Sequence, residues 1–280
     1  MKGQKMIYSI RQMTRCLMLA ITSVVALHAI PLEASAQSEP ENSSLRLYDN
    51  FSAPNIDPSR WYTVYSCDAK TTLECIRQVQ NGSLHLRARA YGDRTSNAGT
   101  EYGPAEFAMV DTAATDVAVE LTVLHIDTSP CVTSPGAGTF GQTILYGNFF
   151  NDGSGTTSGD TTALLVLDRV AGDPPNVVQA SATVQYQGVF LDWITIGSLN
   201  LGERVRIELK WDKSNHQFLA SLYRPAYNTT AQIALPYPSS DSAPAAFPEK
   251  ALGVRAFPQN CTGEPTYVDI EAAFDRVLVN

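Results

Sequence analysis

Leu84-His85-Leu86-Arg87-Ala88-Arg89-Ala90-Tyr91, residues 84–91, alternates strictly along its length. Successive side chains of a β-strand point to opposite faces, so this pattern predicts a strand with one buried and one polar face. The predicted core face carries Leu84, Leu86, Ala88 and Ala90, and the other face carries His85, Arg87, Arg89 and Tyr91. Asn81-Gly82, just before the strand, is a hairpin-turn signal.

The rest of the chain consists of similar short runs broken by turn residues. Further strands are predicted over residues 117–126, 143–150, 161–169, 177–186, 189–196, 204–211, 218–223, 253–257 and 267–279. Loops are predicted at the Gly-rich cluster 151–155 and at the proline-containing stretch 235–249. We find no convincing amphipathic helix, internal repeat or linker. The pattern predicts one all-β domain with two antiparallel sheets packed as a sandwich.

The two ends of this region resemble a known superfamily. After Leu47-Tyr48-Asp49-Asn50-Phe51-Ser52 comes Ile56-Asp57-Pro58-Ser59-Arg60-Trp61, and the chain closes with Phe274-Asp275-Arg276-Val277-Leu278-Val279-Asn280. This pairing resembles the first and last strands of concanavalin A-like lectin and glucanase domains, and residues 202–212 resemble one of their inner hairpins. The resemblance implies a jelly-roll sandwich over residues 45–280 and a glycan as partner.

The first 36 residues predict a secretory signal peptide. They combine four positive charges before residue 16, an apolar stretch over 17–30 and a small-residue cleavage site, Ala34-Ser35-Ala36. The alternative is a membrane anchor, but spanning needs about 20 apolar residues, more than this stretch offers. Residues 37–44 predict a disordered lead-in. We expect a secreted or periplasmic protein without a membrane span once the signal is removed.

Charge argues against nucleic acid as a partner. The chain carries a formal charge of −8. Removing the predicted signal peptide, which holds one acidic and four basic residues, makes it more acidic. Phosphate binding needs clustered Lys and Arg, and the sequence contains no basic run.

Four cysteines follow the predicted signal peptide: Cys67, Cys75, Cys131 and Cys261. An even number in an exported protein predicts disulfides, with three possible connectivities. One arrangement links Cys67 to Cys75 locally and Cys131 to Cys261 across a long loop. A metal site is the alternative, but the spacings lack a C-x-x-C pair.

No known catalytic motif accompanies the resemblance. Laminarinase-type members carry Glu-x-Asp-x-x-Glu or Glu-x-Asp-x-Glu on one strand, where two of the carboxylates act as nucleophile and acid. The nearest approach here is Val268-Asp269-Ile270-Glu271, with Ala273 at the next position on the same face. The alternative interpretation of Asp269 and Glu271 is a solvated strand face.

The polar face of residues 84–91 is the first candidate for a ligand site. A lyase acting on uronates needs Arg to neutralise the carboxylate and His or Tyr as the base. His85, Arg87, Arg89 and Tyr91 provide that set, and Glu120, Tyr146 and Asn148 are expected neighbours if their strands share the same sheet. The competing interpretation is the solvent-facing side of an amphipathic strand.

Tryptophan and calcium provide two further hypotheses. Trp61, Trp193 and Trp211 are possible sugar platforms, because aromatic faces pack against sugar rings, although each also fits a structural role. The resemblance implies a structural calcium ion near the chain ends, where Asp49 and Asp275 offer oxygen ligands. Asp152 and Asp160 are alternatives, and loop carboxylates are often merely solvated.

The sequence as a whole favours a carbohydrate-binding, lectin-like protein. A glycan-active enzyme, either a polysaccharide lyase or a glycoside hydrolase with an unusual site, is the first alternative. An envelope structural or adhesion protein is the second.

Overall fold

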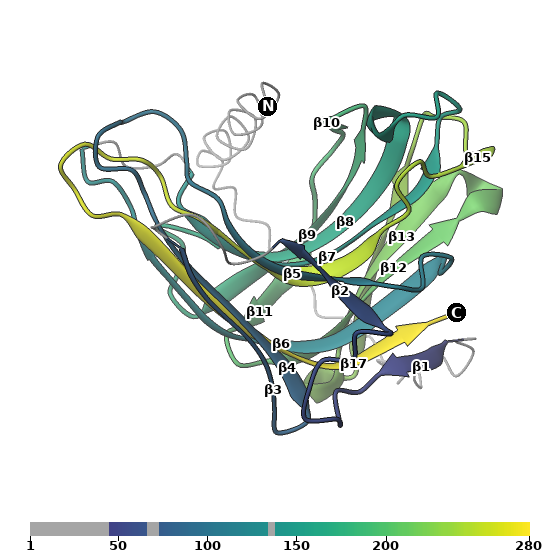
Figure 1. Ribbon diagram of the computed structural model, residues 1–280, viewed down its shortest axis with the longest axis horizontal. Helices are drawn as coiled ribbons and strands as arrows, with labels where there is room; N and C mark the ends of the chain where they lie inside the picture. Colours follow the sequence, from purple (N-terminus) through teal and green to yellow (C-terminus); the bar gives the residue numbers. More distant parts are fainter. Residues whose placement is uncertain (1–44, 66–72, 134–137) are drawn as a thin grey trace, which may run out of the picture. The chain divides into compact units, whose positions relative to one another are not determined.

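Antiparallel strands make up almost all of the fold. The computed structural model describes residues 45–65, 73–133 and 138–280, and the statements below concern these residues. The predicted signal peptide, the lead-in over 37–44 and Cys67 lie outside the described residues. Two sheets lie face to face (Figure 1), so the predicted all-β, two-sheet antiparallel jelly-roll sandwich is confirmed.

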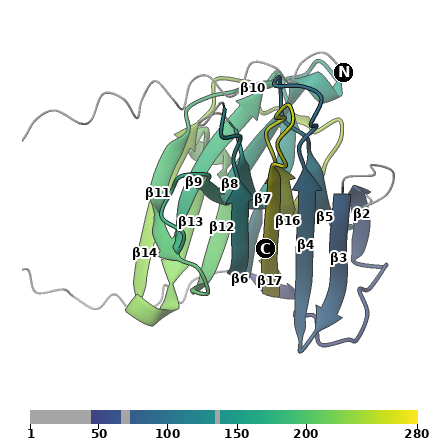
Figure 2. The ribbon, with the colours of Figure 1, turned by 90° about the vertical axis from the view of Figure 1, so that its left-hand side faces the viewer.

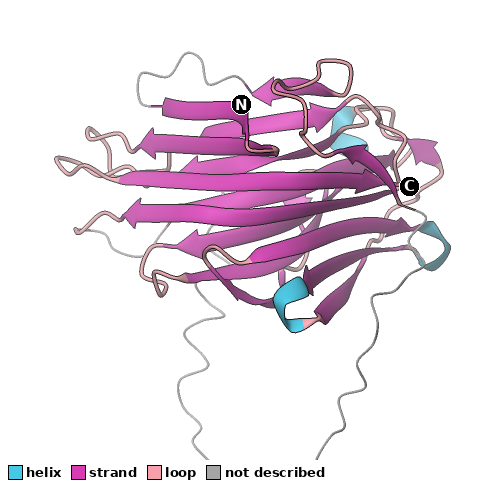
Figure 3. Ribbon diagram, turned by 90° about the horizontal axis from the view of Figure 1, so that it is seen from below, coloured by secondary structure: helices cyan, strands magenta, loops and turns pink. Residues whose placement is uncertain are grey.

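The first sheet, sheet A, contains eight strands. In spatial order they are β14 (Thr229–Pro236), β13 (Gln217–Arg224), β12 (Arg204–Asp212), β6 (Asp116–Ser129), β17 (Tyr267–Val279), β4 (Ser83–Tyr91) and β3 (Leu73–Gln80), with β1 (Arg46–Asp49) paired to β17. Figure 3 shows this sheet from its outer side. The last strand of the chain thus lies in the middle of the sheet.

The second sheet, sheet B, contains nine strands. In spatial order they are β10 (Val189–Phe190), β9 (Val177–Tyr186), β8 (Asp160–Val170), β7 (Phe140–Asn151), β16 (Lys250–Phe257), β5 (Gly103–Met109) and β2 (Trp61–Tyr65), with β11 (Ile194–Asn200) paired to β9 and β15 (Ala243–Pro244) to β7. Sheet B is bent, and its outer face lies on the inside of the bend (Figure 1).

The main hydrophobic core fills the space between the sheets. In β4, Leu84, Leu86, Ala88 and Ala90 are buried and the residues between them are not, as the alternation predicts. At one edge of the sandwich β14 and β11 lie close together, and at the other β3 lies near β5 and β2 (Figure 2). Burial of these inner faces is the main term that stabilises the fold.

Several strands differ from the predicted ones. The single strand predicted over 189–196 is wrong: it is divided into β10 and β11, with Leu191–Trp193 between them. Strands β3, β5 and β14 were not predicted. β5 is buried on both faces, so its sequence does not alternate, whereas edge strand β14 is largely exposed and has a weak apolar pattern.

A buried cluster joins the start of the domain to β2. The indole N–H of Trp61 donates to Asp49 Oδ2 at 2.8 Å, and the backbone N–H of Phe51 donates to Asp49 Oδ1 at 2.8 Å. The Trp61 ring stacks on Phe51 and meets Tyr48 edge-on. Trp61 is therefore a core residue, which agrees with the structural interpretation of this tryptophan.

One of the expected disulfides is present. Cys131 and Cys261 are bonded across 130 residues and are fully buried. Cys67 is outside the described residues, so the pairing of Cys67 with Cys75 remains a prediction.

Among the described residues, no helix has both the length and the apolar character needed to cross a bilayer. Their helical segments are short 3₁₀ turns, such as Lys213–Asn215 (Figure 3).

Replacing both Cys131 and Cys261 with alanine should lower the free energy of unfolding by about 2–5 kcal/mol, because the open chain regains the entropy of a long closed loop. Urea titration without reductant measures the change. An unchanged unfolding midpoint, with an unchanged denaturant slope, would contradict this role for the bond.

Candidate functional site

The predicted site residues lie on two different surfaces. Here the outer side of sheet A is called the sheet-A face, and the outer side of sheet B the sheet-B face. His85, Arg87, Arg89, Tyr91 and Glu120 belong to strands β4 and β6 of sheet A. Tyr146 and Asn148 belong to β7 of sheet B. The condition under which all seven would be neighbours, a shared sheet, is not met for Tyr146 and Asn148, because β7 lies in the opposite layer of the sandwich.

On the sheet-A face, two arginines of β4 converge on one carboxylate of β17. Arg87 donates from Nε to Asp269 Oδ1 at 2.8 Å and from Nη2 to Oδ2 at 2.6 Å. Arg89 donates from Nε and Nη2 to the same Oδ2 at 3.0 and 2.6 Å. Burial alone would raise the pKa of Asp269, but the hydrogen bonds from Arg87 and Arg89 outweigh it and lower the pKa.

Several other polar residues of this face are also paired with one another. Glu74 accepts from Arg89 and from the Tyr91 hydroxyl, and His85 Nδ1 lies 3.3 Å from Glu271 Oε1. Glu120 accepts hydrogen bonds from Arg204 at 2.8 Å and Arg276 at 3.2 Å. These contacts favour the interpretation of the face as a polar, ion-paired surface over that of a uronate site.

The sheet-B face has a different composition. The strand register aligns its side chains in rows across β9, β8, β7, β16 and β5. The first row consists of Gln179, Asp168, Gln142 and Arg255. The second row consists of Ser181, Val166, Ile144, Gly253 and Glu106. The third row consists of Thr183, Leu164, Tyr146, Ala251 and Ala108. An apolar centre is thus bordered by amides, hydroxyls and charges, a composition typical of ligand sites.

A fourth row lies nearest the loops and is called the loop-end row. It consists of Phe190, Gln185, Thr162 and Asn148, on β10, β9, β8 and β7. These four side chains are partly exposed, whereas the apolar centre is buried. The loop-end row is therefore an accessible part of the sheet-B face, as are Gln179 and Arg255 at the other end of the rows.

Aromatic rings lie at two opposite edges of the sheet-B face. Trp193 packs with Phe190, with ring centroids 5.5 Å apart, and both contact the apolar centre. Tyr62 on β2, 37% exposed, lies at the opposite end of the face. Trp211, by contrast, stacks on Phe150 in the core. Of the three tryptophans, Trp193 is the one placed to meet a ligand on this face.

A charged cluster occupies the β16–β5 side of the face. Arg255 donates to Glu106 from Nε at 2.5 Å and from Nη2 at 3.1 Å, and the Tyr102 hydroxyl donates to Glu106 at 3.0 Å. The guanidinium lies 5.0 Å from the Tyr146 ring centroid. Burial alone would lower the pKa of Arg255, but Glu106 raises it, so the arginine stays charged.

Glu249 joins two tyrosines on the same side. The Tyr146 hydroxyl donates to Glu249 Oε1 at 2.6 Å, and Tyr62 donates to Oε2 at 3.4 Å. Burial, followed by the charge of Glu106, raises the pKa of Tyr146 far above its ordinary value. Tyr146 is therefore a hydrogen-bonding phenol and a poor candidate for a general base.

A glycine makes room for the buried carboxylate. Gly253 lies opposite Glu106 in the register. A Cβ on Gly253 would be 2.5 Å from Glu106 Cγ and 2.6 Å from the carbonyl oxygen of Ala105. The absence of a side chain lets Glu106 extend across the face to Arg255.

Asp160 fixes the loop beside the loop-end row. Its Oδ1 accepts from the backbone N–H of Ala246 at 2.7 Å and from the Asn151 amide at 2.7 Å. Its Oδ2 accepts from the backbone N–H of Phe247 at 2.9 Å. The Asn148 amide donates to the Phe247 carbonyl at 2.9 Å. The ends of β7 and β8 are thus tied to residues 246–247.

A buried lysine lies beneath the same region. Lys250 Nζ donates to the Asn148 carbonyl at 2.8 Å and the Thr112 carbonyl at 3.3 Å, and lies 4.4 Å from the Phe149 ring centroid. Burial lowers the pKa of Lys250 to about 8. Lys250 supports the backbone that carries Asn148.

The two carboxylates proposed for calcium have protein partners. Asp49 accepts from Trp61 and Phe51, as described above, and Asp275 accepts from Ser83 at 2.6 Å and pairs with Arg204 at 3.1 Å. Within the described parts of the chain, the metal-type cluster that stands out is Cys131, Cys261 and Glu264, and its two sulfurs form the disulfide. Calcium at Asp49 and Asp275 remains a prediction.

Sequence reasoning missed most of the sheet-B face. Glu106, Glu249 and Arg255 are widely separated in sequence and belong to no recognised motif. Tyr146 and Asn148 were selected, but for the wrong sheet. The available signal was the polar interruption of apolar runs, such as Glu106 within Gly103–Met109.

Comparison with known proteins gives structural likeness without sequence likeness. The winged bean acidic lectin, solved with methyl-α-D-galactose, is 13% identical, with 79% of this chain and 98% of that chain covered and a TM-score of 0.36. A pseudo β-1,3-glucanase and immunostimulatory antigen of Mycobacterium tuberculosis is 14% identical, with 83% of this chain and 97% of that chain covered and a TM-score of 0.44. A β-1,3-glucanase of Mycobacterium marinum is 12% identical, with 82% of this chain and 96% of that chain covered and a TM-score of 0.40. No protein-family model and no curated protein sequence matches the chain.

Replacing Asp269 with asparagine should lower the free energy of unfolding by about 2–3 kcal/mol at pH 7, because two guanidinium groups lose their counter-charge. The pKa of Asp269 is lowered in the folded state, so this advantage is complete above the unfolded pKa of about 3.9 and disappears as pH falls below it. Urea titrations at several pH values test this. Glu271→Gln, on the same strand face, is the control, and a smaller loss is expected from it. If Asp269→Asn and Glu271→Gln lower the free energy of unfolding equally at every pH, the assignment is refuted.

Gly253→Ala should destabilise the protein by about 1–3 kcal/mol, because the new methyl group overlaps Glu106 and the β5 backbone. Gly197→Ala is the matched control, since a Cβ there lies 3.7 Å from its nearest neighbour, Leu222 Cδ2. Thermal unfolding compares the two variants. If Gly253→Ala and Gly197→Ala are equally stable, the position of the Glu106 side chain does not depend on the glycine at 253.

Proposed function

We propose that this protein binds carbohydrate on the sheet-B face and acts outside the cytoplasm as a lectin-like binding protein. The observation that supports this most strongly is the loop-end row: Phe190, Gln185, Thr162 and Asn148 are partly exposed and aligned across four neighbouring strands. The Trp193 ring extends the row at its Phe190 end.

The chemistry of this row suits sugars. A pyranose ring offers apolar C–H groups on its faces and hydroxyl groups around its edge. Aromatic rings pack against the faces, and amide and hydroxyl side chains such as Gln185 and Thr162 donate to and accept from the edge. Three strand spacings of about 4.8 Å give the row a length of about 14 Å, which suits an oligosaccharide better than a single sugar.

Binding fits the site better than turnover. Glu106 is neutralised by Arg255, and Glu249 accepts hydrogen bonds from Tyr146 and Tyr62. A hydrolase needs one carboxyl group to give up a proton and another to act as nucleophile or base, and these carboxylates are already engaged within the protein. Arg255 is already paired with Glu106 and so offers no free counter-charge to a uronate; neutral glycans are therefore the proposed ligands.

Export is part of the same proposal. The N-terminal pattern of residues 1–36 is that of a secretory signal, and the Cys131–Cys261 disulfide suits an oxidising compartment.

In affinity gel electrophoresis against neutral and uronate-containing polysaccharides, we expect retardation by a neutral polysaccharide without release of reducing ends or unsaturated products. Trp193→Ala should weaken retardation at least fivefold, because the ring platform is lost. Tyr227→Ala removes an exposed aromatic residue outside the sheet-B face and should bind like the wild type.

The other outcomes are equally informative. Product release would favour the enzyme hypothesis, with Glu106 and Glu249 as the first residues to replace. Absence of any glycan interaction would refute the proposed function and favour an adhesion role.

A further inference from the structure

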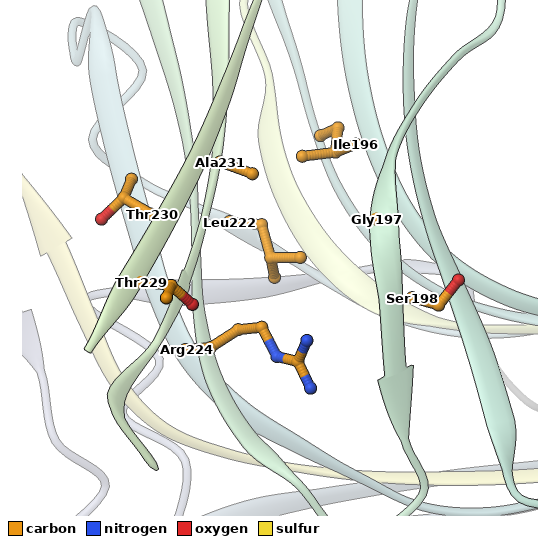
Figure 4. A pocket seen from close by; sticks show the side chains of 8 residues that line it. All are labelled: Ile196, Gly197, Ser198, Leu222, Arg224, Thr229, Thr230 and Ala231. Atoms are coloured by element: carbon orange, nitrogen blue, oxygen red, sulfur yellow. The ribbon is translucent and has the colours of Figure 1, made fainter. Parts of the chain in front are cut away.

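A cavity of about 160 Å³ opens at the edge of the sandwich, where β11 pairs with β9. It lies between β11 of sheet B and strands β13 and β14 of sheet A (Figure 4). Both β11 and β14 are edge strands. The opening therefore leads from solvent to the interior between the two sheets.

The cavity has an apolar floor. Leu222 is buried, and Ile196 and Ala231 are half-buried beside it. The register of β11 against β9 shifts between Thr195 and Gly197, so Ile196 is an extra residue in a β-bulge. Gly197, next to the bulge, has no side chain to fill the space, and a Cβ there would only reach ordinary contact with Leu222.

Arg224 forms the polar wall. Figure 4 shows its side chain reaching between the strands. Its Nε and Nη2 donate to Glu203 at 2.6 and 2.8 Å, and Tyr227 lies 4.5 Å from the guanidinium carbon. Among the described residues, none accepts a hydrogen bond from Nη1. The Arg224–Glu203 pair is neutral overall, so it offers a hydrogen-bond donor rather than an unpaired charge.

We infer that this cavity is a binding site for a neutral, single-ring aromatic group carrying one hydroxyl or carbonyl oxygen. A cavity of about 150 Å³ with aliphatic walls is large enough to hold benzene. The volume here is similar, and Ser198, Thr229 and Thr230 line the cavity together with its aliphatic floor. The ring would lie against Leu222, Ile196 and Ala231, and its oxygen would accept from Arg224 Nη1. A charged ring would lose hydration without gaining a counter-charge.

Phenol is the probe for this site, followed by methyl signals in ¹H–¹³C NMR spectra of the full protein. We expect saturable shifts confined to Ile196, Leu222 and Ala231, with phenol binding more tightly than toluene, benzoate or anilinium. Gly197→Val should weaken phenol binding at least tenfold, because its methyl groups occupy the space. Ala234→Val, on β14 but outside the cavity lining, should bind phenol like the wild type.

Thermal unfolding of all variants shows whether each is folded, and Arg224→Met, which removes the hydrogen-bond donor, provides a second test that leaves the floor intact. That variant should lose the preference for phenol over toluene while still binding toluene. Non-saturable shifts, or equal phenol binding by the wild type and Gly197→Val, would overturn the assignment and leave a water-filled opening. Equal binding of phenol and toluene by the wild type would overturn the role of Arg224.

Discussion

The architecture depends on the insertion of the last strand into the middle of sheet A. β17 pairs with β4 on one side, with β6 on the other, and with β1 beyond the end of β4. Without these thirteen residues, sheet A would be three separate pieces, and the inner faces of β4 and β6 would lose their shared neighbour. The hydrogen-bonded ion pairs of Arg87 and Arg89 with Asp269 also join β4 to β17. Backbone pairing and ion pairing therefore both hold β4 against β17.

The fold class was predictable because it depends on local alternation. β4, β9, β12 and β17 each follow the period-two pattern, and their predicted positions agree closely with the structure. Strand pairing was not predictable in the same way, because it links residues far apart in the chain. Neither were strands buried on both faces, such as β5, whose continuous apolar sequence gives no alternating signal.

The candidate site was harder to predict for the same physical reason. Alternation indicates which side chains share a face of one strand, but not which strands share a sheet. Arg87 and Arg89 drew attention as ionisable residues in a regular pattern, yet their partner, Asp269, lies about 180 residues away. On the sheet-B face, three strands and a loop bring together Glu106, Tyr146, Glu249 and Arg255. These residues are distant in sequence and form no short motif.

The Asp160 carboxylate has a consequence for the energetics of recognition. By holding the backbone of Ala246 and Phe247 and the side chain of Asn151, it fixes the connection beside the loop-end row as part of the folded domain. The Phe247 side chain is half exposed, while its backbone N–H and C=O are both hydrogen-bonded. A glycan bound here, as proposed, would meet a surface whose conformational entropy was lost during folding, so little ordering would oppose association. Such rigidity favours slow dissociation and narrow selectivity over adaptability.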